Sequence, residues 1–164
     1  MKRMFFALLI VAVLISGFAE AADKFACVDL EQVFNEYQKT KDEEAKLTKI
    51  GEEKQKDIDS KLKEVDRLKE KMDLLSDKEK EKVKVELDQK MEELRQFDRQ
   101  VRTDLMRQRN EIIEGILQEI NEVVEDYSKS KKYTIMFNSR ALLYKNNDLD
   151  VTKELIEYLN KQYK

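Results

Sequence analysis

From Thr40 to Tyr127 the chain alternates charged residues with a thin apolar stripe, and no proline interrupts it. The apolar residues mostly recur three or four positions apart, which puts them on one face of a helix. A seam this narrow is typical of helices that pair as a coiled coil, so the pattern predicts helix throughout. The seam consists of Leu47, Ile50, Ile58, Leu62, Val65, Leu68, Met72, Leu75, Val83, Leu87, Met91, Leu94, Phe97, Val101, Leu105, Ile112, Ile116, Ile120, Val123 and Tyr127.

A predicted turn divides this helical run near its middle. Ser76 and Glu79 fit a capping box, in which the serine hydroxyl accepts from the backbone N–H three residues on and the glutamate reaches back. One helix is therefore predicted to end near Leu75 and the next to begin at Asp77. Because the connection is so short, the two helices must run antiparallel, as a hairpin arm over residues 40–111 with its tip near 75–77.

Charges of both signs cover the predicted arm in balance. Residues 38–111 contain 21 lysines and arginines and 21 aspartates and glutamates. Such a surface keeps an extended hairpin in solution without repelling itself. Mixed charge on a helix is ordinarily a solvated face, so we assign no individual arm charge a binding role.

The first 21 residues have the pattern of a secretory signal peptide. A basic start precedes an apolar core from Phe5 to Phe18, and Ala19 and Ala21 supply the small residues that signal peptidase reads. This core is short for a membrane span, so we expect cleavage after about Ala21 and export of the rest. The whole chain carries −3, and loss of the leader's net +1 leaves −4.

The segments on either side of the arm are predicted to form a small body, over residues 22–39 and 112–164. Asp29 is expected to cap a short helix, Thr40 with Glu43 to cap the outgoing arm helix, and Asp150 to cap a last helix. Period-two apolar alternation and bounding turn residues predict short strands over 24–29, 133–137 and 141–144.

This body is too small to cover a core by itself. Three short strands and two short helices, about 50 residues in all, leave sheet edges open. The predicted class is therefore α+β, mostly α, with a long antiparallel coiled-coil hairpin on a small β body that other copies of the chain complete. The residues predicted to form this oligomerisation region are Phe25, Cys27, Val28, Val33, Phe34, Ile135, Phe137, Leu142 and Tyr144.

The two end segments carry a family resemblance. The stretches 28–41, 133–137, 141–144, 149–152 and 159–161 resemble the corresponding parts of the Skp (OmpH-like) periplasmic chaperones, in the same order along the chain. The resemblance implies a homotrimer in the periplasm, whose three arms enclose a cavity that holds unfolded outer-membrane proteins without ATP. The best-known members are strongly basic, so the −4 charge here predicts at most weak contact with a membrane surface, and no lipopolysaccharide-binding residues are carried over.

Other classes of function find little support in the residues. With no histidine, one cysteine and three scattered glycines that form no phosphate loop, nothing predicts an enzyme, a metal site or a cofactor. An acidic exported chain lacks the basic stripe that nucleic acids need. A cytoplasmic prefoldin-like chaperone would share the arms but not the signal peptide. An envelope coiled-coil scaffold without clients remains the alternative, although it does not predict a strand-bearing base.

Client contacts are predicted near the arm tip. Met72, Leu74, Leu75 and Met91 are the candidates, although packing within the hairpin is favoured for three of them, and only Leu74 lies off the seam. Gly51 lies inside the outgoing helix, where glycine costs about 0.5–1 kcal/mol relative to alanine. It is either a pliable point that lets the arm splay or a tolerated surface glycine.

Overall fold

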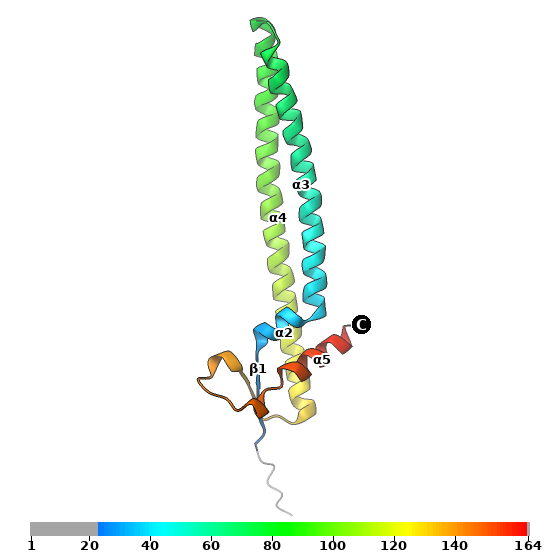
Figure 1. Cartoon of the computed structure of the whole chain (residues 1–164), viewed down its shortest axis with the longest axis vertical. Coiled ribbons are helices and arrows are strands. Elements are labelled where there is room, and N and C mark those ends of the chain that lie inside the picture. The colour runs from blue at the N-terminus through cyan, green and yellow to red at the C-terminus, as the bar shows by residue number, and fades with distance from the viewer. Residues whose placement is uncertain (1–22, 164) are drawn as a thin grey trace, which may run out of the picture.

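The computed structural model describes residues 23–163 and shows a long two-helix arm on a small body (Figure 1). It confirms the predicted class, mostly α with a hairpin on a small β body. The leader predicted over residues 1–21 lies outside the described residues. In chain order the elements are β1 Phe25–Val28, α2 Leu30–Glu36, α3 Gln38–Asp73, α4 Asp77–Lys131, β2 Ile135–Asn138, the 3₁₀ turns η1 Ser139–Ala141 and η2 Asn147–Leu149, and α5 Thr152–Gln162.

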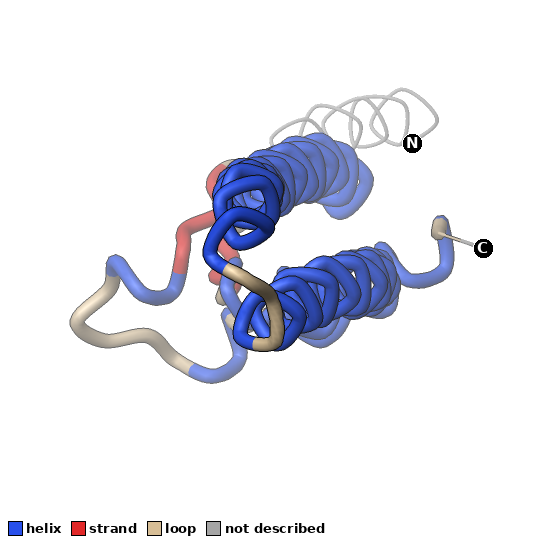
Figure 2. Tube along the Cα trace, turned by 90° about the horizontal axis from the view of Figure 1, so that it is seen from above, coloured by secondary structure: helices blue, strands red, loops and turns tan. Residues whose placement is uncertain are grey.

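The arm consists of α3 and the first part of α4, which lie side by side (Figures 1 and 2). Its seam is closed most tightly by Val65, Val83, Leu87 and Val101, each at most 8% exposed. The turn between the helices occupies residues 74–76, and the Ser76 capping box is present at the start of α4. Since α4 has 55 residues and α3 has 36, the last turns of α4 continue past the arm into the body.

Ion pairs along the arm mostly join residues three or four apart on one helix. Arg102 with Asp98, at 2.9 Å, and Arg107 with Glu111, at 3.1 Å, are examples. Lys90 and Glu64, at 3.9 Å, form a pair that crosses between the arm helices. Exposed pairs of this kind contribute about 0–1 kcal/mol each, so the seam rather than the charges holds the hairpin together.

The bend between α2 and α3 differs from the prediction. Asp29 caps α2 as expected, accepting from the backbone N–H groups of Glu31 and Gln32 at 3.0 Å. The predicted cap at Thr40 is wrong, because α3 already begins at Gln38 and Tyr37 is the extended residue at the break. Thr40 lies in the first turn, 2% exposed, and its hydroxyl has no hydrogen-bond partner among residues 23–163.

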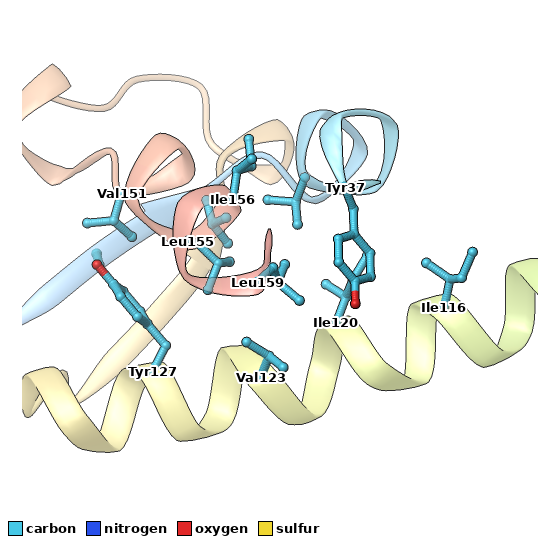
Figure 3. Close-up of a cluster of buried hydrophobic side chains, with 12 residues drawn as sticks. Tyr37, Ile116, Ile120, Val123, Tyr127, Val151, Leu155, Ile156 and Leu159 are labelled. Carbon is cyan, nitrogen blue, oxygen red and sulfur yellow. The ribbon is translucent and has the colours of Figure 1, made fainter. Parts of the chain in front are cut away.

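The body core lies between α4, α5, α2 and one face of the sheet. Figure 3 shows Leu155 and Leu159 of α5 between that helix and the ribbon of α4, which contributes Ile120 and Val123. Leu155 is fully buried, and burying a leucine side chain stabilises a fold by about 1.5–3 kcal/mol. The remaining buried members are Ala26, Val28, Val33, Tyr37, Ile116, Tyr127, Val151 and Ile156.

The sheet has two strands within residues 23–163, not three. β1 pairs with β2 in parallel, and the strand predicted over 141–144 is absent. The Asn138 side chain accepts from the Arg140 backbone N–H at 3.2 Å, which bends the chain into η1 instead of a hairpin. Beyond it, Leu143 and Tyr144 have no neighbouring strand to pair with, so their strand-like composition is not expressed in a single chain.

Candidate functional site

The first candidate surface is the outer face of the sheet. The register places Phe25 opposite Ile135 and Cys27 opposite Phe137, so these four residues share one face, and the opposite face joins the body core. Cys27 is covered, and its backbone forms a bridge with Asp150. The other three side chains are 43%, 45% and 40% exposed. We call Phe25, Ile135 and Phe137 the sheet face.

The outer edge of the sheet lies beside this face. β2 pairs with β1 on one side, and no strand within residues 23–163 pairs with its other edge. Backbone N–H and C=O groups at an open edge are a template for pairing with another chain. An apolar face next to an open edge is therefore suited to contact with another strand.

A second surface is the loop that follows β2. Figure 1 shows this segment, drawn in orange, standing away from the body between η1 and η2. Leu143 is fully exposed and Tyr144 is 86% exposed. We call these two residues the loop tip. Two adjacent large apolar side chains held out in solvent make the loop tip a candidate contact site.

Ionic contacts anchor both ends of this loop to the body. Arg140 pairs with Asp29 and Glu31, and Lys145 pairs with Asp150. Thr152 links the second pair to the sheet, because its hydroxyl donates to Asp150 Oδ1 at 2.5 Å and accepts from the Asp29 backbone N–H at 2.9 Å. The loop tip is therefore exposed on a base that is firmly fixed.

Val151 is the residue directly before α5, but the side chain that caps the helix is the Asp150 carboxylate. Its Oδ1 accepts from the Thr152 backbone N–H at 3.0 Å. Burial alone would raise the pKa of Asp150, but the hydrogen bonds from Lys145 and Thr152 outweigh burial and lower the pKa to about 2. A charged Asp150 is therefore part of the native fold.

We expect the folded body to lose stability in acid through Asp150. Because the folded-state pKa is depressed, the contribution is present above about pH 4 and is lost as the pH falls toward about 2. The shift is worth about 1–2 kcal/mol once partial exposure is allowed for. Urea unfolding of the parent and Asp150→Asn at fixed protein concentration measures this. The stability gap should narrow between pH 5 and pH 2, and a constant gap would contradict the assignment.

The nine residues predicted for oligomerisation fall into three groups. Some are buried in this chain's own core, where their contacts within one chain explain their burial. The exposed ones coincide with the sheet face and half of the loop tip. Leu143 was missed, because strand alternation placed it on the opposite side from Leu142 and Tyr144. Cys27, Val28 and Val33 are buried; Phe34 and Leu142 are half-buried; Phe25, Ile135, Phe137 and Tyr144 are exposed.

The predicted client contacts are spread along the upper arm. Leu74 lies in the turn and is 88% exposed, whereas Met72, Leu75 and Met91 are half-buried against the hairpin. Sequence reasoning missed three exposed apolar side chains on α4. Each lies off the seam, so a search for apolar residues outside the three-and-four spacing would have found them. They are Val85, Met106 and Leu117.

Gly51, the candidate hinge, has ordinary helical geometry in α3. A Cβ added there would meet only Leu105 Cδ1, at 3.9 Å, which is a normal van der Waals contact. Packing therefore does not require glycine at this position. Its role as a pliable point stays a prediction.

An apolar groove of about 530 Å³ lies where the arm meets the body, between α3 and α4. Leu47 and Thr40 line it from α3, and Met106 and Ile112 line it from α4. Arg109 stands at the groove, in the gap of the apolar seam between Leu105 and Ile112. The seam is therefore open where the arm meets the body.

Among residues 23–163, no group of three or more acidic, histidine or cysteine side chains is placed to hold a metal ion. Of the helices in this part of the chain, none has the length and apolar character needed to cross a membrane. The surface of residues 23–163 does offer apolar contact area, at the sheet face and the loop tip.

Comparison with known proteins identifies the family. The family model "Outer membrane protein (OmpH-like)" matches residues 24–159. The chain belongs to the OmpH-like family. An uncharacterized protein of Aquifex aeolicus (strain VF5) is 32% identical over 163 residues, covering 98% of each chain. A crystal structure from Caulobacter crescentus CB15, of a protein assigned as an OmpH-like outer membrane chaperone, matches with a TM-score of 0.79, 13% identity and 88% of each chain covered, a likeness in fold.

OmpH-like proteins are a chaperone family, and membership supports a chaperone role for this chain. The match extends over both end segments and the arm, so the body and the hairpin belong to one family unit.

Proposed function

We propose that the protein is an ATP-independent periplasmic holdase that keeps unfolded outer-membrane β-barrel proteins from aggregating. In this proposal three copies join through their bodies, and the three arms enclose a cavity for the client. The observation that carries it is that one family member combines an exposed apolar sheet face with a long hydrophilic arm.

Self-association is supported by the sheet face, the open edge of β2 and the loop tip. A second copy that added a strand to β2 would remove an exposed edge and cover Phe137. The loop tip of each copy would reach a neighbour in a closed ring. The number three comes from the family resemblance, since the geometry of one chain does not fix it.

Client holding is supported by isolated apolar side chains on a charged arm. Leu74, Val85 and Met106 are each exposed by 65% or more, and the groove at the arm base offers another weak contact. None of these binds tightly alone. Several weak contacts in an enclosed space raise the effective concentration of client and arm, which delays aggregation without a fixed recognition sequence.

We propose a periplasmic location for this chain because two observations agree. The first 21 residues have the signal-peptide pattern, and the family is one of periplasmic chaperones. Export would place the protein beside its clients during their transit to the outer membrane.

Two measurements on the purified mature protein test the proposal. Light scattering should give a mass close to three times that of one chain. A β-barrel membrane protein diluted from urea should stay in solution in its presence and aggregate in its absence. A coiled-coil scaffold would leave aggregation unchanged, and a stable monomer would overturn the trimeric cavity.

A further inference from the structure

The joint between α2 and α3 lacks a cap of its own. Tyr37 is extended there, with φ −65° and ψ 127°, and its side chain makes no capping hydrogen bond. The first backbone N–H groups of a helix have no partner within the helix and need one from elsewhere. The partner for α3 comes from the far end of the chain.

Asn160, in the last turn of α5, supplies it. Its Oδ1 accepts from the Gln38 backbone N–H at 2.8 Å, and its Nδ2 donates to the Glu36 backbone C=O at 3.5 Å. One side-chain amide thus bridges the last carbonyl of α2 and the first N–H of α3. An amide side chain offers both an acceptor and a donor, whereas a carboxylate offers acceptors alone.

Further contacts hold the same joint. The Tyr37 ring meets the Tyr163 ring edge to face, with centroids 5.7 Å apart, so α5 contacts the joint twice. From the other side, the Tyr37 hydroxyl donates to Glu119 of α4 at 2.6 Å, and Lys39 pairs with the same carboxylate. Burial would raise the pKa of Glu119, but Lys39 and Tyr37 outweigh it and keep the pKa below its usual value.

Two connections run from the body into the arm at this level. α4 passes through without a break, but it carries Gly115 there, and no other atom of residues 23–163, apart from Gly115, its chain neighbours and the backbone of its own helix turns, lies within 4 Å of the position a Cβ would take. The groove leaves the space between α3 and α4 only partly filled. The arm can therefore tilt if α4 bends near this level and the base of α3 moves away from α5.

The effect of such a tilt grows along the arm. α3 has 36 residues, which makes it about 54 Å long, so a change of about 10° at its base moves the tip by about 9 Å. Contacts at the joint thus have far more influence on tip position than contacts higher in the seam.

We propose that Asn160 is a positioning residue that fixes the base of α3 against α5 and so sets the direction in which the arm leaves the body. The positioning role of Asn160 is inferred from these contacts alone. Its consequence for client capture rests on the proposed holdase function, because arm direction would determine the width of the cavity.

Distances between spin labels test the inference. Labels on cysteines at exposed Ser60 of α3 and exposed Lys153 of α5 report the angle between arm and body. Diluting labelled with unlabelled chains leaves at most one labelled copy in an assembly. The buried Cys27 is checked for labelling in the chain without added cysteines. We expect Asn160→Ala to broaden the distance distribution at least about twofold, while Lys161→Ala, the neighbouring exposed residue, leaves it unchanged.

Asn160→Asp keeps the acceptor for Gln38 but loses the donor to Glu36, so we expect intermediate broadening. If Asn160→Ala fails to fold, Asn160→Asp decides the test. A parental distance distribution in Asn160→Asp would then overturn the proposal. Parental distributions in both variants also overturn it. Client protection is measured on the same samples. If the parent protein protects no client, the holdase proposal fails, whereas broadening in the variants would still support the positioning role.

Discussion

Replacing Phe137 by aspartate is expected to convert the proposed assembly into folded monomers and to abolish client protection. Phe137 belongs to the sheet face, is 40% exposed, and lies on β2, whose outer edge is open among residues 23–163. A carboxylate buried there without a partner would cost several kcal/mol, enough to lower the association constant by a factor of about 1000 or more. Sedimentation velocity at a fixed protein concentration measures the assembly.

A matched control separates loss of assembly from a general effect of added charge. Val85 of α4 is also exposed, 65%, but lies on the arm and off the seam. Val85→Asp should keep the parental mass, and Phe137→Leu should do the same because it preserves an apolar contact. Circular dichroism must show that the aspartate variant keeps its helices. A Phe137→Asp protein that still sediments as the parent would place the assembly surface elsewhere.

The hairpin could be predicted because its information is local. Spacing of three and four residues sets the seam, and the Ser76 capping box marks the start of α4. Both signals act within a few residues of where they are read. The charged faces need no partner at all, so nothing distant could alter them.

The body could be predicted only in outline, because its contacts join residues far apart in sequence. β1 pairs with β2 across more than a hundred residues of intervening chain, and no local pattern encodes that register. Thr40 has the residue type and spacing of a cap. The side chain that accepts from the first backbone N–H of α3, at Gln38, is nevertheless Asn160, 122 positions away. The strand predicted over 141–144 has suitable residues, but a strand also needs a partner, which residues 23–163 of one copy do not provide.

The candidate surfaces also divide into features that local sequence predicts and features that depend on contacts between distant residues. Exposure of Leu74 could be predicted from its position off the seam in a turn. Val85 and Met106 are also off the seam, but their significance depends on neither helix covering them, which becomes visible only when α3 and α4 are seen together. The groove at the arm base has a trace in the sequence, the gap at Arg109, whereas its depth depends on how far the helices diverge.

Shortening the arm should weaken client holding while leaving the body and its assembly intact. Deleting residues 58–71 and 83–96 removes 14 from each helix, or about 21 Å of an arm of about 54 Å. The cut preserves the seam, because Met72 takes the place of Ile58 and Phe97 takes the place of Val83. We expect about tenfold more protein to be needed to keep a large unfolded β-barrel protein in solution, since multiple weak contacts are lost together.

A length-matched control distinguishes arm length from arm sequence. Filling both deletions with coiled-coil heptads of mixed lysine and glutamate, and an apolar seam in the same phase, restores the length without the native residues. Recovery of client protection would show that an enclosing arm suffices. Continued loss would assign the effect to side chains of the removed segments, Val85 among them. Both variants should retain the parental number of copies per assembly. A shortened protein that protects large clients as well as the parent would place client holding in the body, where the sheet face and the groove at the arm base are the remaining apolar surfaces.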